Sequence, residues 1–332
     1  MPGMEVLIQP LQRIIEVEPG ANLLEALRGA QVPMSYSCMA GRCGTCRCRV
    51  VDGDVLDSGR AEQNPLDAQD SYVLACQTFL TEPCTIDIPE SDEVVVHPAR
   101  IVKARVLAVE NLTHDIKRVV LKPAKAIEFS PGQHTKLEFG SGLARTYSMA
   151  GVSDDPTLEF HVRILAGGRV SAYVADELSP GDAVRVSGPL GNAYLRHKHD
   201  GPMLCVAGGT GLAPILSIVR GAVAKGMRNP IHLYVGARAP RDVYGFDVLA
   251  DLQRSHPALE LNVVVASGGS ERGSQRRGLV TEAIARDLGD LAGWNAYLCG
   301  SPPMVEAVAL LARQKGIDPA RTYTQAFYTR LD

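Results

Sequence analysis

Four cysteines have the spacing of ligands for an iron–sulfur cluster. Cys38, Cys43 and Cys46 follow C-x4-C-x2-C spacing, and Cys76 follows after a longer gap. Three thiolates crowded into one loop, with a fourth further along the chain, form the plant-type ligand pattern of a [2Fe–2S] cluster. A structural zinc site is the alternative, but its ligands usually come as two separate C-x2-4-C pairs. The spacing therefore favours one two-iron cluster held by these four cysteines.

The surroundings of this loop are basic. Arg42, Arg47 and Arg49 lie around it, and residues 35–50 contain no acidic side chain. Nearby positive charge stabilises the reduced, more negative cluster, which predicts a potential above the ~−400 mV of plant-type ferredoxins. Cys48 and Cys84 fall outside the ligand spacing and are predicted to be buried, inert thiols.

A second group of residues could hold a flavin. Arg145-Thr-Tyr147-Ser148 ends a predicted strand, and a glycine pair that ends at Gly168 opens a predicted helix containing Ser171. Free amides at a helix start suit a phosphate, an arginine can pair with the same anion, and an aromatic ring can stack on a flat heterocycle. Each short motif is weak alone, and their order along the chain gives them weight.

A third group could hold a nicotinamide nucleotide. In MLCVAGGTGLAP an apolar strand runs into Gly208, Gly209, Thr210 and Gly211 and then into a helix, so a pyrophosphate could approach the helix start. The turn lacks the G-x-G-x-x-G fingerprint, so a standard dehydrogenase is not indicated. The segment NAYLCGSPPM ends a later strand with Cys299 and Gly300, although Cys299 could equally be a structural thiol.

Three blocks of different pattern must position these groups. Residues 4–90 carry short β-rich runs around one helical stretch with Asn22 as its N-cap, which predicts a compact α+β unit. Residues 101–197 show alternating strands divided by turns, typical of an antiparallel barrel or sandwich. From residue 202, apolar strands alternate with helices, which predicts a parallel sheet of the α/β class. Residues 89–100, bracketed by prolines, read as a linker.

Composition narrows the class of protein. The chain has 332 residues and a formal net charge of −3, which indicates no pull toward nucleic acid or a membrane surface. No apolar run approaches the ~18 residues of a transmembrane helix, and no secretory signal is visible. These features predict a soluble cytoplasmic protein in which the eight cysteines serve redox or metal chemistry rather than disulfides.

Together the three blocks resemble the ferredoxin-NADP reductase superfamily with a fused plant-type ferredoxin domain. The stretches SYSCMAGRCGTCRCRV, GPMLCVAGGTGLAPILSIVRGA and LAGWNAYLCGSPPMVEA are especially similar to the reductases of naphthalene-type aromatic-ring-hydroxylating dioxygenases. The resemblance spans the chain. It implies a β-grasp ferredoxin domain at 1–93, an antiparallel β-barrel FAD domain at 94–199, and a Rossmann-like parallel-sheet NAD(P) domain at 200–332.

The resemblance also implies roles for individual residues. Arg145 would contact the flavin phosphates, Tyr147 the isoalloxazine and Ser148 the region of its N5, while Phe327 matches the C-terminal aromatic residue that covers the flavin. Cys299 matches the cysteine near the transferred hydride. The implied phosphate contacts are Gly168 and Ser171 for the flavin and Gly208, Gly209, Thr210, Gly211 and Gly300 for the nucleotide.

The resemblance implies an electron route from NADH or NADPH through FAD and the cluster to an external acceptor. A nicotinamide gives two electrons together and a [2Fe–2S] cluster carries one, so a flavin between them matches the two. The implied acceptor is a small Rieske-type ferredoxin that feeds the oxygenase, with the reductase a monomer. Direct delivery to a two-component oxygenase is one alternative, and a non-enzymatic redox sensor is another. Neither the nucleotide preference nor the aromatic substrate follows from the sequence.

Overall fold

The computed structural model describes residues 3–34, 36, 39, 41, 46–58, 71–88, 97, 99–140, 142–268 and 275–328. Contacts divide the chain into two units, Met1–Ala99 with Leu190–Asn192, and Arg100–Pro189 with Ala193–Asp332. The first unit has one hydrophobic core and the second has two. None of the helices in the described ranges is long and apolar enough to cross a membrane.

The described residues of the first unit form a mixed sheet, a separate pair of strands and one helix. Its main strands have the order β2-β1-β7-β3-β5, in which β1 pairs with β7 in parallel and the other neighbours are antiparallel. The bounds are β1 (Met4–Gln9), β2 (Arg13–Val17), β3 (Arg47–Asp52), β5 (Tyr72–Leu74) and β7 (Cys84–Asp87), with β4 (Val55–Asp57) and β6 (Thr78–Leu80) as a separate pair. This arrangement is the predicted α+β class.

The helix described in this unit, α1 (Leu23–Gly29), begins where the sequence predicts. Asn22 is its N-cap, and the Asn22 side chain accepts a hydrogen bond from the Glu25 amide. Leu23, Leu24 and Leu27 keep helical spacing and are fully buried in the core of the unit. Such an N-cap satisfies one of the amides that a helix start leaves without an intrahelical partner.

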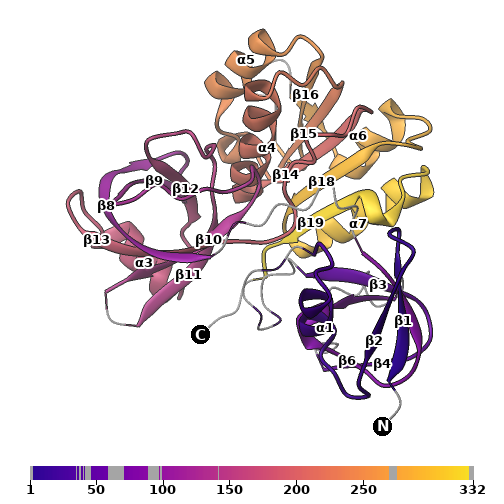
Figure 1. The fold of residues 1–332 in the computed structure, drawn as a ribbon. Coiled ribbons are helices and arrows are strands. Elements are labelled where there is room, and N and C mark those ends of the chain that lie inside the picture. Colours follow the sequence, from indigo (N-terminus) through magenta and orange to yellow (C-terminus); the bar gives the residue numbers. More distant parts are fainter. Residues whose placement is uncertain are drawn as a thin grey trace. The chain divides into compact units, whose positions relative to one another are not determined.

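The second unit begins with an antiparallel six-stranded sheet of order β11-β10-β13-β8-β9-β12. An isolated bridge between Met149, just after β11, and Phe160 in β12 joins the two edge strands, so the sheet closes almost into a barrel (Figure 1). The bounds are β8 (Arg100–Asn111), β9 (Ile116–Pro123), β10 (His134–Phe139), β11 (Leu143–Ser148), β12 (Leu158–Arg163) and β13 (Ala183–Leu190). Helix α3 (Arg169–Asp176) packs against β11 and β12.

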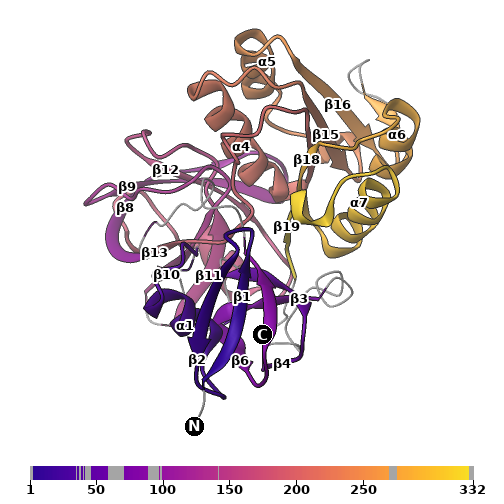
Figure 2. The ribbon, with the colours of Figure 1, turned by 45° about the vertical axis from the view of Figure 1, so that its right-hand side comes forward.

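The rest of this unit is a parallel sheet of order β17-β16-β15-β14-β18-β19, as the alternating pattern predicts. Helices cover its faces, with α4 against α5 and α6 against α7 (Figures 1 and 2). The strands are β14 (Met203–Gly208), β15 (Ile231–Ala237), β16 (Leu259–Val265), β17 (Arg276–Arg277), β18 (Asn295–Gly300) and β19 (Thr322–Ala326). The helices are α4 (Leu212–Ala224), α5 (Phe246–Ser255), α6 (Val280–Asp287) and α7 (Pro302–Gln314). Because both faces are covered, β14 and β18 are almost entirely buried.

One buried serine joins the barrel to the parallel sheet. Ser217 of α4 accepts a hydrogen bond from the Gly132 amide (3.0 Å) and donates one to the Gly151 carbonyl (2.6 Å). Ser217→Ala leaves both backbone groups without this partner, so we expect the free energy of unfolding of this unit to fall by about 1–3 kcal/mol. Denaturant unfolding followed by the fluorescence of Trp294 measures the change. Ser255→Ala, at the exposed end of α5, is the matched control, and an equal loss in both variants would contradict the prediction.

Candidate functional site

Two of the four predicted cluster ligands lie in the described residues and are neighbours. Cys46 directly precedes β3, and Cys76 lies in the short 3₁₀ helix η2 (Ala75–Gln77) that follows β5. Antiparallel pairing of β3 with β5 brings the two segments together, since Arg47 is opposite Leu74. The Asn22 side-chain amide also donates to the Cys76 carbonyl (3.1 Å), so the helix cap holds one end of this segment. Cys38 and Cys43 lie outside the described residues.

The surroundings of these two sulfurs suit thiolate ligands of a metal cluster. The Cys76 amide points at Cys46 Sγ (3.4 Å), and the Gly41 amide points at Cys76 Sγ (3.3 Å). The hydrogen bond with Cys76 and burial raise the pKa of Cys46, so without a metal the Cys46 side chain is a neutral thiol. Iron would supply the positive charge that stabilises buried thiolates, and amides directed at the sulfurs tune such clusters. The donor set present therefore fits a [2Fe–2S] cluster.

The other two cysteines of this unit are buried structural thiols, as predicted. Cys48 and Cys84 lie in the core of the first unit. Burial raises the pKa of Cys48 to about 12 and that of Cys84 to about 11, so neither is a ready nucleophile.

The basic rim is weaker than the sequence indicates. Arg49 forms an ion pair with Asp87 (3.2 Å), which sits opposite it in the pairing of β3 with β7. Arg47 stacks on the Tyr72 ring at 3.6 Å, while Arg42 lies outside the described residues. The acidic partner comes from a strand far along the chain, so a local count of charges misses it. An elevated cluster potential remains a prediction.

The predicted flavin residues lie on one edge strand of the barrel. Arg145, Tyr147 and Ser148 belong to β11, and period-two alternation places Arg145 and Tyr147 on the same face. Arg145 is exposed, Tyr147 is half-buried and Ser148 is buried at the strand end. Burial raises the pKa of Tyr147 to about 12, so its hydroxyl stays protonated at neutral pH. An exposed cation and a ring on one face fit the phosphates and flat ring of a flavin nucleotide.

At the second turn predicted to bind the flavin phosphates, the backbone amides and the serine hydroxyl have different roles. Gly168 is the N-cap of α3, and no side chain caps this helix start, which leaves its first amides available to an anion. Ser171 accepts a hydrogen bond from the Leu165 amide and donates to the Gly168 carbonyl, both at 3.1 Å. The Ser171 hydroxyl therefore stabilises the turn itself, and the backbone amides are the groups suited to the flavin phosphates.

A hydrogen-bonded triad surrounds Ser148. Gln325 of β19 donates from Nε2 to Ser148 Oγ (3.0 Å) and lies 3.0 Å from His134 Nδ1, and His134 is the residue opposite Ser148 on β10. Gln325 Oε1 is buried and finds no partner within the described part of the chain. A buried acceptor without a partner marks a place where a ligand can donate a hydrogen bond. Burial lowers the pKa of His134 to about 4, so this histidine is neutral at physiological pH.

The predicted nucleotide residues meet at the switch point of the parallel sheet. The chain leaves β14 toward β15 on one side, whereas β18 and β19 lie on the other side of β14. Gly208 ends β14 and Gly209–Gly211 follow it, while Gly300 ends β18, so both turns lie at the carboxyl ends of adjacent strands. Ligands of open α/β sheets bind in the crevice at this point.

Two glycines of this turn are required by its geometry. A Cβ on Gly211 would lie 2.1 Å from the Cys299 carbonyl oxygen, which is backbone that cannot move aside. Gly209 has a φ of 56°, a conformation that side chains disfavour. The turn therefore holds its backbone against β18 and presents the start of α4, which has no side-chain cap.

Cys299 lies in the core of the parallel sheet. Its side chain is fully buried in the cluster that contains Cys205 and Leu212, and burial raises its pKa. The described structure thus gives it the surroundings of an inert thiol at the edge of the crevice. Phe327 follows β19, is half-buried, and donates its amide to the Gly300 carbonyl (2.8 Å). This bond holds the C-terminal aromatic residue beside the nucleotide turn.

An arginine can pair with the 2′-phosphate that distinguishes NADPH from NADH, and the five candidate arginines differ in their surroundings. Arg276 forms a paired contact with Asp287 that includes a bond of 2.9 Å, so its guanidinium is engaged. Arg238, Arg241 and Arg277 are exposed, and Arg272 lies outside the described residues.

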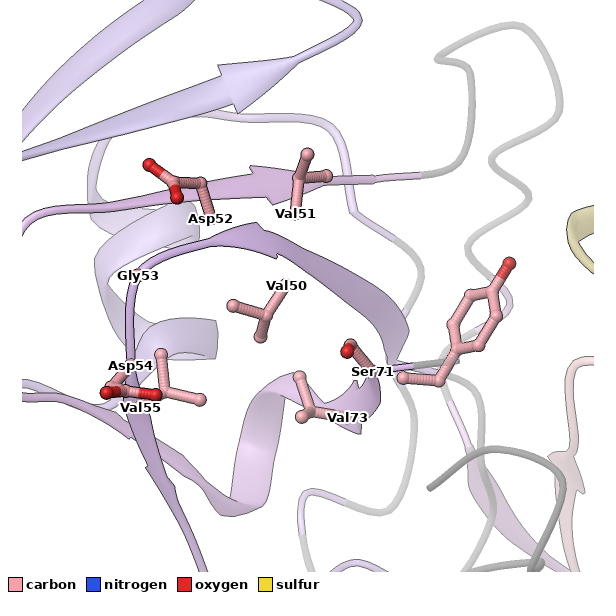
Figure 3. A pocket seen from close by; sticks show the side chains of 9 residues that line it. Val50, Val51, Asp52, Gly53, Asp54, Val55, Ser71 and Val73 are labelled. Atoms are coloured by element: carbon pink, nitrogen blue, oxygen red, sulfur yellow. The ribbon is translucent and has the colours of Figure 1, made fainter. Parts of the chain in front are cut away.

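A hollow in the first unit contains none of the predicted site residues. Figure 3 shows its lining, which comes from the β3–β4 hairpin and from β5 and includes Val50, Asp52, Asp54 and Val73. It plays no part in the arrangement described above.

Three family matches cover the chain in the predicted order. They are the 2Fe-2S iron-sulfur cluster binding domain at residues 6–81, the oxidoreductase FAD-binding domain at 103–194 and the oxidoreductase NAD-binding domain at 205–309. The reductase component of a naphthalene 1,2-dioxygenase/salicylate 5-hydroxylase system from Ralstonia sp. is 56% identical over 98% of this chain and 99% of its own length. That of the naphthalene 1,2-dioxygenase system of Pseudomonas putida is 55% identical over the same shares. This chain belongs to the ferredoxin–NAD(P)+ reductase components of dioxygenase systems.

Solved structures agree with the fold of this reductase. An Amycolatopsis cytochrome P450 reductase has a TM-score of 0.72 and 33% identity over 98% of both chains. A ferredoxin reductase of a carbazole 1,9a-dioxygenase has a TM-score of 0.67 and 25% identity over the same shares. The predicted fold class is confirmed: a ferredoxin domain, a barrel-like FAD domain and a parallel-sheet NAD domain.

Gln325 and His134 of the reductase lie in no recognisable motif and were not predicted as site residues. Gln325→Leu removes the amide that holds Ser148 and His134, so we expect flavin reduction by NADH to slow by about tenfold. This factor corresponds to the loss of one to two hydrogen bonds. Stopped-flow absorbance measures the rate, and the exposed Gln314→Leu is the matched control. Unchanged flavin reduction in the Gln325 variant would contradict a positioning role.

Proposed function

We propose that this reductase takes hydride from NADH or NADPH and delivers single electrons to a small Rieske-type ferredoxin, which supplies a naphthalene-, salicylate- or nitroarene-type dioxygenase. The full-length similarity to two naphthalene-system reductases, at 56% and 55% identity, carries this proposal. We further propose domain boundaries of 1–93, 94–199 and 200–332, a monomeric state and a cytoplasmic location.

Each domain contributes a distinct part of the reaction. FAD, when bound, accepts two electrons as hydride and releases them one at a time, and the cluster carries one electron. In the proposed site, Arg145 and the amides after Gly168 bind the flavin nucleotide, and Tyr147 packs beside its ring. Ser148 is held at the strand end by Gln325. No acid–base pair is needed, because the protein's role is to hold the nicotinamide and the flavin in the correct relative orientation.

The nucleotide turn has an equally simple task. The turn presents backbone amides to a pyrophosphate at the start of α4, and Gly300 lies at the end of the neighbouring strand. The residues of the turn are Gly208, Gly209, Thr210 and Gly211. Phe327 stands beside this turn through its bond to Gly300. The thiol of Cys299 is fully buried and neutral, so it supplies no charge to the neighbouring turn.

Anaerobic absorbance spectroscopy tests the proposal. The purified protein should show flavin bands over broad iron–sulfur absorbance, both should bleach on addition of NADH, and a purified Rieske-type ferredoxin should then be reduced. A protein that ignores both NADH and NADPH would contradict the reductase function. Bleaching without transfer to the ferredoxin would contradict only the proposed acceptor.

Direct delivery to an oxygenase is a second candidate because the same three-part arrangement occurs beyond dioxygenases. A relative from Amycolatopsis, 35% identical over 95% of this chain, is the reductase subunit of an aromatic O-demethylase. Adding the terminal oxygenase with and without the small ferredoxin separates the two. We expect product only when the ferredoxin is present.

A further inference from the structure

A chain of buried side chains runs from the barrel to the nucleotide turn. His161 of β12 lies 2.9 Å, through Nδ1, from the Tyr244 hydroxyl, and the two rings meet edge to face. His161 Nε2 lies 3.1 Å from Glu159 Oε1. The Tyr244 hydroxyl also lies 3.3 Å from the Gly209 carbonyl and is placed to donate to it. Both rings are more than nine-tenths buried, so water does not compete for these bonds.

The protons carried by Glu159, His161 and Tyr244 determine which of these hydrogen bonds can form at the same time. Burial alone would raise the pKa of Glu159, but hydrogen bonds from His161 and Arg118 lower it to about 2, so the carboxylate only accepts. Burial raises the pKa of Tyr244, so its hydroxyl keeps one proton. If that proton goes to Gly209, His161 must donate from both ring nitrogens. A neutral His161 would instead accept the tyrosine hydrogen bond on Nδ1 and leave Gly209 without this donor.

The Gly209 carbonyl matters because it belongs to the turn proposed to hold the pyrophosphate. A peptide group is planar, so the direction of the Gly209 carbonyl fixes the opposite direction of the Thr210 amide. Amides at the start of α4 are the groups that an anion would use. Gly209 also has a φ of 56°, in a region where glycine moves freely, so the peptide needs an external restraint.

We propose that His161, protonated on both ring nitrogens, turns the Tyr244 hydroxyl toward Gly209 and so holds the nucleotide turn in its binding conformation. Loss of one proton from His161 releases the carbonyl and weakens nucleotide binding. His161 and Tyr244 are positioning residues in this scheme, because neither needs to touch the nucleotide. The inference rests on the nucleotide site proposed above.

The charges around the pair are compatible with a cationic imidazole. Arg118 of β9 is opposite His161 in the sheet and is held by Glu159 (2.8 Å) and Glu110 (2.9 Å). On the side of Tyr244, Arg163 of β12 pairs with Asp115 at 3.2 Å. Asp242 faces His114 at 3.7 Å, and one Asp242 oxygen also accepts from the Ala239 amide. The carboxylates in this region outnumber the cations Arg118 and Arg163, so they would balance a positive charge on His161. These carboxylates are Glu159, Glu110, Asp115 and Asp242.

Nucleotide binding to the FAD- and cluster-loaded protein tests the proposal without turnover. The dissociation constant of NAD+ is measured from flavin difference spectra between about pH 5.5 and about pH 9. In the wild-type protein we expect it to rise about fivefold across a single-proton step, the effect of losing one hydrogen bond. Tyr244→Phe should bind weakly at every pH and show no step. Histidine-labelled ¹⁵N NMR, assigned with His161→Gln, should show two ring protons on His161 at the acidic end.

Tyr234→Phe is the matched control, since that buried tyrosine donates to Asp287 (3.0 Å) in the same sheet but not to the turn. It should keep the step. A wild-type dissociation constant that does not change with pH, a step that survives in Tyr244→Phe, or a single ring proton on His161 at the acidic end would each overturn the inference while the reductase function stands. Failure of the wild-type protein to bind any nicotinamide nucleotide would instead contradict the proposed function, and this inference with it.

Discussion

Cys76→Ser is expected to abolish reduction of protein electron acceptors, such as a ferredoxin, while NADH still reduces the flavin. The sulfur of Cys76 lies beside Cys46 and receives the Gly41 amide, so a serine there replaces a thiolate ligand with a hydroxyl that iron binds poorly. The broad iron–sulfur absorbance should disappear. Ferredoxin or cytochrome reduction should fall to background, whereas two-electron dyes should still be reduced at close to the wild-type rate.

Cys48→Ala is the matched control for this variant. Its thiol is also buried in the core of the first unit but lies outside the ligand spacing. It should keep its iron and its ferredoxin reduction. Iron retained at two atoms per chain in Cys76→Ser would contradict the ligand assignment, and loss of the flavin along with the cluster would show general misfolding instead.

Gly211→Ala should slow reduction of the flavin by NADH by about a hundredfold. A Cβ at this position would approach the Cys299 carbonyl carbon at 2.5 Å and the Gly300 amide nitrogen at 2.8 Å, both of which are backbone in the centre of the sheet. The turn must therefore move away from β18. A displacement of about 1 Å in a group that positions a substrate can change a rate by about this factor. Anaerobic stopped-flow measurement with NADH and the flavin-loaded protein gives the rate.

Gly289→Ala separates this effect from a general response to the substitution. Gly289 belongs to the same domain and has open space around its Cα. Its flavin reduction should match the wild-type rate. Dithionite should reduce the flavin of Gly211→Ala normally, because the flavin strand is not altered. A wild-type rate with NADH in Gly211→Ala would show that the turn does not position the nucleotide.

Elements with a local signal were predicted well from the sequence. Asn22 caps α1 through its own side chain, and the change from alternating strands to apolar strands with helices separates the barrel from the parallel sheet. Glycine, proline and the spacing of apolar residues determine the conformation of only a few neighbouring residues. Their effect can therefore be predicted from a short stretch of sequence. The same holds for the GGTG turn, which follows β14 where the strand pattern places it.

Side-chain partners that come from distant strands were missed. Asp87 reaches Arg49 only through the register of β7 on β3, and Gln325 reaches Ser148 only because β19 joins the edge of the parallel sheet. Tyr244 has no motif around it, yet it connects His161 with Gly209. Such contacts depend on tertiary packing, which no local pattern encodes. The roles assigned to Arg145, Tyr147 and Cys299 remain predictions.

The central strands β14 and β18 have a consequence for producing this protein. Their segments MLCVAG and NAYLCG are apolar, uncharged and almost fully covered by helices in the folded chain. Short β-prone stretches of this kind associate with one another when they are exposed. Substitutions that weaken the packing of α4 or α7 should therefore first lower the yield of soluble protein and increase the fraction found in inclusion bodies. The molecules that remain in solution should keep their normal turnover per flavin.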